Sequence, residues 1–184
     1  SGTAVLRFSQ VAAEYTDAPV VAVGGPGIAR EVAFGIPTAA VFGSAFPEAL
    51  HLTQQVFGTP DYLVETTFDI AGVELAAALK NAFAMSFGMV DGAEKASKLP
   101  HANLRAALFP RALAELRDLV AALGGEPETV YGQAGLGDLQ VTAAAGRNRL
   151  LGERIGAGAT AADAVGDLSI AGITTEGFAV TALG

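Results

Sequence analysis

The sequence predicts an α/β fold followed by an all-α region, and two features of the chain indicate this division. Up to about Phe68, short apolar runs that suit β-strands alternate with helical ones, which is the pattern of α/β proteins. From Asp69 onward the strand pattern disappears and only helical segments remain. We therefore expect a domain boundary near residue 68, between an α/β domain over residues 1–68 and a helical domain over residues 69–184.

Three strands are expected in the α/β region, at residues 19–23, 38–42 and 62–66. Each is a short run rich in β-branched, aromatic or small apolar residues. A glycine-bearing turn that enters a helix is expected over residues 25–32, and a second helix over residues 47–56.

The helical region is expected to begin with a long helix over residues 69–90, capped by the carboxylate of Asp69. Further helices are expected over residues 102–123, 147–156, 160–168 and 174–183. Glycines at residues 124–125 and 132–137 separate these segments.

Composition excludes several classes of function. The 184 residues carry a formal net charge of −8, which argues against nucleic acid or an anionic membrane as a partner. Cysteine is absent and only His51 and His101 supply imidazole, so we expect no metal site, no disulfide and no histidine-based triad. The N-terminal residues lack a basic segment followed by a long apolar run, and a cytoplasmic location is expected.

Lys80 lies inside one of the most apolar stretches of the chain, residues 69–90. The stretch is long enough to cross a membrane, but Glu74 and Lys80 would each cost roughly 2.5–3.5 kcal/mol there, so a buried helix explains it better. A desolvated ammonium costs several kcal/mol unless it is paired. Such a lysine either extends to a polar rim or takes part in proton chemistry, and this segment alone leaves both open.

The first of three glycine-bearing segments covers Gly24 to Val32. Its small residues would let a backbone approach a ligand, and the following helix start suits an anion. A plain strand-to-helix turn is the simpler interpretation. The segment is not a dinucleotide fingerprint, because Arg30 stands where its third glycine belongs.

The second segment runs from Gly132 to Leu139 and delivers one acid, Asp138. One interpretation is a plain loop in which Asp138 caps the next helix. The other is a turn that places the carboxylate of Asp138 beside the ammonium group of Lys80, where it would hold that charge in position.

The third segment runs from Thr142 to Arg149, and in it Arg147 follows Gly146 at the start of a helix. A bidentate guanidinium beside helical N–H groups suits a phosphate, although a single arginine can equally be a solvated surface residue.

Taken in order, these segments resemble the NAD(P)-dependent glycerol-3-phosphate dehydrogenases. The matching positions span nearly the whole chain and lie at Gly25–Val32, Pro37–Ala39, Gly72–Leu75, Ala78–Asn81, Asp91-Gly92, Gly135–Leu139, Gly146–Asn148 and Glu176-Gly177. Each is weak alone, whereas the ordered set is specific.

The resemblance implies the C-terminal part of a Rossmann-like NAD-binding domain, followed by a helical substrate domain of the 6-phosphogluconate dehydrogenase C-terminal type. It implies Lys80 as the catalytic acid–base group and Arg147 as the main phosphate ligand. The substrate-binding positions implied are Gly25, Gly27, Lys80, Asn81, Asp138, Thr142, Gly146, Arg147 and Asn148. The positions implied to contact the cofactor, NAD or NADP, are Ala29, Arg147, Thr174 and Glu176.

The sequence also departs from the family pattern. Gly27 replaces a common serine or threonine, and the loop from Asp138 to Arg147 is short. The G-x-G-x-x-[GA] segment and the ribose-reading residue that the family carries are missing, so the choice between NAD and NADP stays open. We therefore expect a fragment of a longer enzyme that is inactive by itself.

The expected reaction is hydride transfer between NAD(P) and dihydroxyacetone phosphate or sn-glycerol 3-phosphate, a step that feeds phospholipid biosynthesis. Two alternatives stay open. One is a reductase of small hydroxy acids that uses the same lysine. The other is a non-catalytic remnant or assembly module with an open sheet edge. The oligomeric state is also open, with a homodimer among the possibilities.

Overall fold

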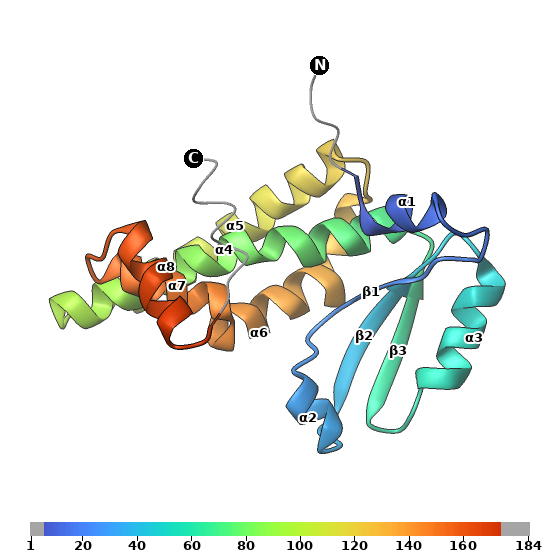
Figure 1. The fold of residues 1–184 in the computed structure, drawn as a ribbon, viewed down its shortest axis with the longest axis horizontal. Helices are drawn as coiled ribbons and strands as arrows, with labels where there is room; N and C mark the ends of the chain where they lie inside the picture. Colours follow the sequence, from blue (N-terminus) through green and yellow to red (C-terminus); the bar gives the residue numbers. More distant parts are fainter. Residues whose placement is uncertain (1–5, 174–184) are drawn as a thin grey trace. The chain divides into compact units, whose positions relative to one another are not determined.

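The computed structural model describes residues 6–173 and divides into two compact units. The first comprises the chain up to Ala78 together with Leu116–Asp138, and the second comprises Leu79–Glu115 together with the chain from Leu139 onward. The long helix α4 (Ile70–Ser97) contributes residues to both units (Figure 1). These units are defined by packing, and residues 116–138 pack with the first unit although they follow α4 in the sequence. The domain boundary expected near residue 68 therefore stays a prediction.

A three-stranded sheet in the order β1-β2-β3 forms the centre of the first unit (Figure 1). β1 (Ala22–Gly24) pairs antiparallel with β2 (Thr38–Gly43), and β2 pairs parallel with β3 (Tyr62–Thr67) in a register that sets Thr38 opposite Tyr62. Alternate side chains of β2 and β3 pack against α3 (Pro47–Phe57) and bury a small core made of Ala40, Phe42, Leu50 and Val64.

The expected strands 38–42 and 62–66 are confirmed, and each extends one residue further. The expected strand 19–23 is mostly wrong, because only residues 22–24 pair with β2. The carbonyl of Val20 instead accepts a hydrogen bond from the hydroxyl of Ser44, at 2.7 Å. The helix expected within 25–32 is α2 (Ala29–Ala33), which has five residues.

A short helix, α1 (Phe8–Ala13), was not expected from the sequence. Its first turn is fixed by tertiary contacts, because both the backbone N–H and the hydroxyl of Ser9 donate to the carboxylate of Glu74 on α4. The Gln10 side chain adds a local bond by accepting from the backbone N–H of Arg7, at 2.9 Å.

The last part of the first unit contains the end of α5 (Ala102–Ala122), a 3₁₀ helix η1 (Pro127–Tyr131) and a single π-helical turn η2 (Gln133–Gly137). Asp69 caps α4 as expected, since its Oδ1 accepts from the N–H of Gly72 at 2.8 Å. Its Oδ2 accepts from the N–H of Glu126 at 2.9 Å and from the hydroxyl of Thr129 at 2.6 Å. The cap of α4 thus also holds η1.

Helices alone make up the described part of the second unit. They are the later part of α4, the first part of α5, α6 (Asp138–Ala145, from Leu139), α7 (Arg147–Gly156) and α8 (Ala161–Ile170). Met85, Leu151, Ala164 and Leu168 form a buried core between α4, α7 and α8. Thr160 caps α8 by accepting from the N–H of Asp163, at 3.2 Å.

The expected helices over 102–123, 147–156 and 160–168 are confirmed within two residues at each end. α4 runs seven residues past the expected end at residue 90, to Ser97. The short loop expected between Asp138 and Arg147 is wrong, because Asp138–Ala145 is helical. The helix expected over 174–183 lies outside the described residues.

α4 is long and apolar enough to cross a membrane by length and composition. The same is true of many core helices of soluble proteins. Within the second unit, α4 lies directly against α7 and carries Asp91, which is ion-paired with two arginines. Such packing and charge favour a core helix.

Candidate functional site

The residues of the predicted site divide between the two units. The first unit holds Gly25, Gly27, Ala29 and Asp138, and the second holds Lys80, Asn81, Thr142, Gly146, Arg147 and Asn148. Thr174 and Glu176 lie outside the described residues.

In the first unit the structure brings together two glycine segments that are more than 100 residues apart in the sequence. A β-carbon added to Gly24 would lie 2.9 Å from the β-carbon of Ala134, and one added to Gly137 would lie 3.3 Å from the ring of Pro26. The turn after β1 therefore packs against η2. Sequence reasoning treated these segments separately, since no local pattern relates them.

Gly25 and Gly27 have different roles in this turn. Gly25 has a φ of 137°, and a β-carbon there would lie 3.0 Å from the carbonyl oxygen of Ala39. Glycine is therefore required for the turn itself. Gly27 is exposed, and the nearest atom to an added β-carbon would be the oxygen of Gly25, at 3.8 Å. Gly27 and the exposed Ala29 thus leave the surface of the turn open.

Asp138 follows η2 as the first residue of α6, and it is buried with 5% of its surface exposed. The glycines before it have a packing role, because a β-carbon at Gly135 would overlap the backbone of Val130 in η1. The plain loop expected over 132–137 is therefore wrong, since these residues form a π-helical turn packed on η1. Asp138 as the orienting partner of Lys80 stays a prediction.

In the second unit, Lys80 and Asn81 lie on α4, and both are half-buried. The full burial that the apolar sequence around Lys80 suggests is therefore only partly realised. A half-buried ammonium keeps some contact with water, which lowers its desolvation cost.

The corner between α6 and α7 carries Thr142, Gly146, Arg147 and Asn148. The expected helix start at Arg147 is confirmed, with Gly146 as the N-cap residue of α7. The N–H of Gly146 donates to the carbonyl of Thr142 at 2.8 Å, and a β-carbon at Gly146 would overlap that carbonyl. Arg147 is exposed, which is expected both of a phosphate ligand and of a solvated surface arginine. Asn148, in contrast, is only 2% exposed.

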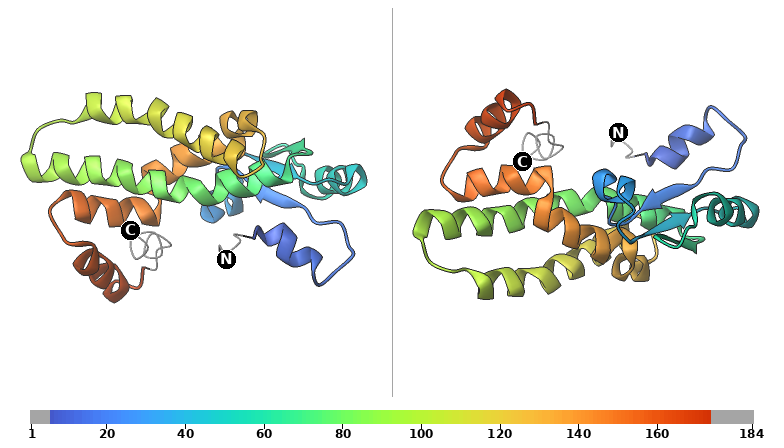
Figure 2. Two further views of the ribbon diagram at one scale, coloured as in Figure 1. Left: turned by 90° about the horizontal axis from the view of Figure 1, so that it is seen from above. Right: turned by 90° about the horizontal axis from the view of Figure 1, so that it is seen from below.

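α4 and α7 run parallel and meet through their backbones (Figure 2). A β-carbon on any of four glycines would overlap a backbone carbonyl of the facing helix. On α4, Gly88 faces the carbonyl of Arg149 and Gly92 faces that of Glu153. On α7, Gly152 faces the carbonyl of Met85 and Gly156 faces that of Met89. The same register can be followed one helical turn further toward the N-terminal ends of both helices. There the start of α7 lies beside the turn of α4 that follows Asn81. Arg147 and Asn148 are thereby brought to the same end of the helix pair as Lys80.

A network of charges that sequence reasoning missed joins α4, α5 and α7. Asp91 pairs with Arg105 and Arg149, and Glu153 pairs with Lys95 and Arg149. The hydrogen bond from Lys95 is the largest cause that lowers the pKa of Glu153, and the charges of Lys95 and Arg149 act in the same direction. Asp91 and Gly92 stand among the positions of family resemblance, which is the signal that could have identified them.

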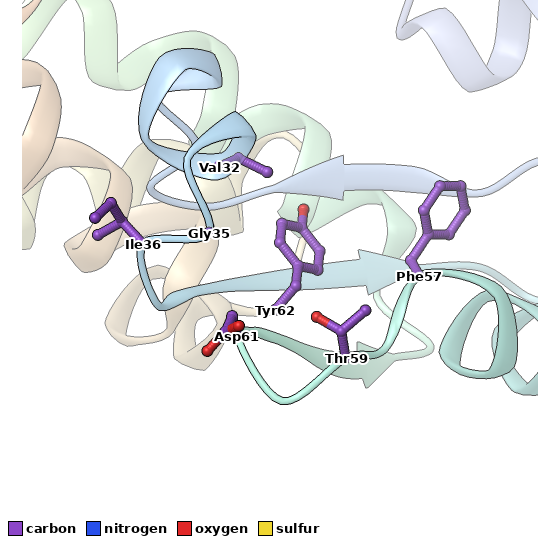
Figure 3. Close-up of a pocket in the computed structure, with 7 residues that line it drawn as sticks. All are labelled: Val32, Gly35, Ile36, Phe57, Thr59, Asp61 and Tyr62. Carbon is purple, nitrogen blue, oxygen red and sulfur yellow. The ribbon is translucent and has the colours of Figure 1, made fainter.

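A cavity of about 440 Å³ lies in the first unit at the beginnings of β2 and β3 (Figure 3). It is lined mainly by apolar side chains, including Val32, Ile36, Phe57 and Tyr62, with Asp61 at its side. Among the predicted site residues that the structure describes, none lines this cavity. Within residues 6–173, no group of three or more histidine and acidic side chains lies close enough together to hold a metal ion.

The sequence from the start of α4 onward matches a known family. The family model described as the NAD-dependent glycerol-3-phosphate dehydrogenase C-terminus aligns with residues 69–183, which is more than half of the chain. The chain belongs to the NAD-dependent glycerol-3-phosphate dehydrogenase family.

Individual members of the family are similar over most of this chain. The NADP(+)-dependent glycerol-3-phosphate dehydrogenase of Archaeoglobus fulgidus is 37% identical over 159 residues, which cover 86% of this chain and 48% of that protein. The glycerol-3-phosphate dehydrogenase (NAD(P)+) of Thermus thermophilus is 45% identical over 150 residues, which cover 80% of this chain and 44% of that protein. The chain therefore spans about half the length of the curated relatives it matches.

A solved structure agrees with this assignment. The crystal structure of glycerol-3-phosphate dehydrogenase from Coxiella burnetii superposes with a TM-score of 0.76 at 35% identity, and covers 88% of this chain and 49% of its own. The expected family and the expected α/β-then-helical fold are both confirmed. The individual site residues of this glycerol-3-phosphate dehydrogenase family member stay predictions.

Proposed function

We propose that this chain supplies the acid–base and phosphate-binding residues of an NAD(P)-dependent glycerol-3-phosphate dehydrogenase. The reaction is the interconversion of sn-glycerol 3-phosphate and dihydroxyacetone phosphate. The observation that supports it most directly is the α6–α7 corner. There an exposed arginine and a buried asparagine begin a helix that runs parallel to the helix of Lys80.

Lys80 is the proposed general acid and base. Its ammonium group would donate a proton to the carbonyl oxygen of dihydroxyacetone phosphate as that carbon is reduced. In the reverse direction the neutral amine would take the proton of the glycerol 3-phosphate hydroxyl. A bound nicotinamide supplies or accepts the hydride.

Arg147 and Asn148 are the proposed phosphate ligands. A guanidinium binds two phosphate oxygens at once, and the helix start adds a favourable dipole. The phosphate itself does not react. Binding it would fix the position of the reacting carbonyl carbon and so lower the barrier of the chemical step. Gly25, Gly27, Asn81, Asp138 and Thr142 are proposed to complete the substrate site.

The described residues fit the nucleotide only in part. Gly27 and Ala29 leave an open surface that could accept one side of a ligand. α2 has only five residues, and Arg30 occupies the position of the third fingerprint glycine, so this turn does not hold a pyrophosphate. NAD or NADP is therefore proposed as the cofactor of the complete protein, in the cytoplasm, with this chain contributing Ala29, Arg147, Thr174 and Glu176.

The test is dihydroxyacetone-phosphate-dependent oxidation of NADH and NADPH, measured on this chain and on the chain extended to the full length of its relatives. We expect activity only in the extended protein, and a much weaker reaction with dihydroxyacetone, which lacks the phosphate. Equal turnover of a small keto acid would favour a hydroxy-acid reductase. An extended protein that folds but reduces none of these substrates would favour the non-catalytic alternative.

A further inference from the structure

Asp91 on α4 lies between two arginines that come from different helices. Its Oδ1 accepts a hydrogen bond from Nη1 of Arg105 on α5 at 2.5 Å, and its Oδ2 forms an ion pair with Nε of Arg149 on α7 at 2.9 Å. The side chains of Asp91 and Arg149 are 20% and 19% exposed. One partly buried carboxylate thus contacts two guanidinium groups.

Arg105 extends this arrangement to the end of α6. Its Nη2 donates to the carbonyl oxygen of Ala143 at 3.0 Å, and its guanidinium lies 5.3 Å from the centre of the Phe87 ring. Ala143 belongs to the last turn of α6, where carbonyl groups lack a partner within the helix and a positive charge is favourable. The neighbouring carbonyl, that of Thr142, is taken by the N–H of Gly146.

Arg149 fixes the other side of the same corner. It lies in the first turn of α7, two residues after Arg147, and its Nη1 also pairs with Glu153 at 3.1 Å. Its backbone carbonyl lies against Gly88 of α4. The first turn of α7 is therefore held to α4 both by a side chain and by its backbone.

These contacts all converge on the segment that carries Thr142, Arg147 and Asn148. We infer that Asp91 is a positioning residue, which acts through Arg105 and Arg149 to hold the α6–α7 corner in the geometry that binds the substrate phosphate. The inference rests on the proposed function of that corner. Without the charge of Asp91, two guanidinium groups would face each other without a carboxylate between them. They would separate and release both the end of α6 and the first turn of α7.

The test uses the complete enzyme and the substitution Asp91→Asn, which keeps the shape of the side chain but removes its charge. The measured quantities are kcat and KM for dihydroxyacetone phosphate and for dihydroxyacetone. We expect KM for the phosphorylated substrate to rise roughly tenfold or more, while kcat/KM for dihydroxyacetone changes less than about threefold. The preference for the phosphorylated substrate should therefore fall by about the same factor as KM rises.

A purely structural role predicts a different result. Loss of folded enzyme lowers the rates with both substrates equally and leaves their ratio unchanged, and that outcome would overturn the inference. Glu94→Gln is the matched control, because it also removes a carboxylate from α4. Among the described contacts, the carboxylate of Glu94 accepts only from the backbone N–H of His101. It should leave the ratio unchanged.

If Asp91→Asn does not fold, Arg149→Lys provides the second variant. Lysine keeps the positive charge but lacks the planar guanidinium that contacts Asp91 and Glu153 at the same time. We therefore expect the same fall in the preference for the phosphorylated substrate. An unchanged ratio in this variant would also overturn the inference. If the wild-type enzyme does not reduce dihydroxyacetone phosphate, both the proposed function and the inference are overturned. An active wild type whose variants keep their preference would overturn the inference alone.

Discussion

Gly88 of α4 lies directly beneath the backbone carbonyl of Arg149 of α7, with no room between them for a β-carbon. Three further glycines repeat this relationship along the same pair of helices. The close approach brings the first turn of α7 near the backbone of α4, and so makes the position of the Arg147–Asn148 segment dependent on these glycines.

Substitution of Gly88 or Gly152 by alanine should separate the two helices. Each added methyl group would overlap a backbone carbonyl, which cannot move aside as a flexible side chain can. We expect each variant to lose about 1–3 kcal/mol in free energy of unfolding, measured by urea denaturation. Gly166→Ala in α8 is the control, because nothing lies within 4 Å of the added atom. That change should stabilise by about 0.5–1 kcal/mol. Similar effects at Gly88 and Gly166 would contradict the packing described here.

Asp69→Asn should separate the two functions of that side chain. The amide oxygen can still cap α4 at Gly72, but the amide nitrogen would face the N–H of Glu126, donor against donor. We expect a loss of about 1–3 kcal/mol and faster hydrogen exchange at Glu126. Thr129→Val removes only the hydroxyl bond and should cost about 0.5–1.5 kcal/mol. Wild-type stability in Asp69→Asn would show that the contact to η1 contributes nothing.

Lys80→Ala in the complete enzyme should lower kcat by about 10²–10⁴-fold, which is the usual contribution of a positioned acid–base group. Steady-state rates with dihydroxyacetone phosphate at saturating NADH measure this effect. Unfolding curves of the variant serve as the control for folding. Turnover at the wild-type rate would end the assignment of Lys80.

Arg147→Ala should mainly raise KM for the phosphorylated substrates, because the guanidinium is proposed to bind a group that does not react. Arg154→Ala is a suitable control, since that arginine lies in the last turn of the same helix and pairs at 3.8 Å with Asp167. An unchanged KM in the Arg147 variant would locate the phosphate elsewhere.

The carboxylate of Glu153 should make stability depend on pH. Its pKa in the folded chain is lowered from the ordinary value of 4.5, first by the hydrogen bond from Lys95. The unfolded chain therefore binds this proton more readily than the folded one. The stabilisation is present above about pH 4.5 and is lost as the pH falls through the lower folded pKa. The difference in unfolding free energy between wild type and Glu153→Gln should be largest above pH 5 and shrink on acidification. A difference that stays constant from pH 7 to pH 3 would contradict this linkage.

Much of the fold could be predicted because it depends on local patterns. The alternating residues of β2 and β3 and the apolar spacing of α3, α4, α5 and α7 were identified within a few residues, apart from the later end of α4. The cap at Asp69 and the glycine before Arg147 were predicted for the same reason. In each of these, the signal lies within one helical turn or one strand.

The elements that were missed depend on residues far away in the sequence. α1 is short and gains its contacts from Glu74, and the π-helical turn η2 packs through Ala134 against Gly24 at the end of β1. α6 ends where Arg105 donates to Ala143. No window of sequence around these segments contains the partner that stabilises them.

The same distinction applies to the candidate site. By itself the sequence determined the family and the residue types, because lysine, arginine and asparagine at fixed positions after particular glycines form an ordered and specific set. Only the tertiary structure decided that the segment around Gly25 packs against the one before Asp138, and that α4 and α7 meet in parallel through their glycines. It also decided that Asp91 joins Arg105 to Arg149 beneath the α6–α7 corner. The physical reason is that close packing and charge pairing act between atoms a few ångströms apart in space, whatever their separation along the chain.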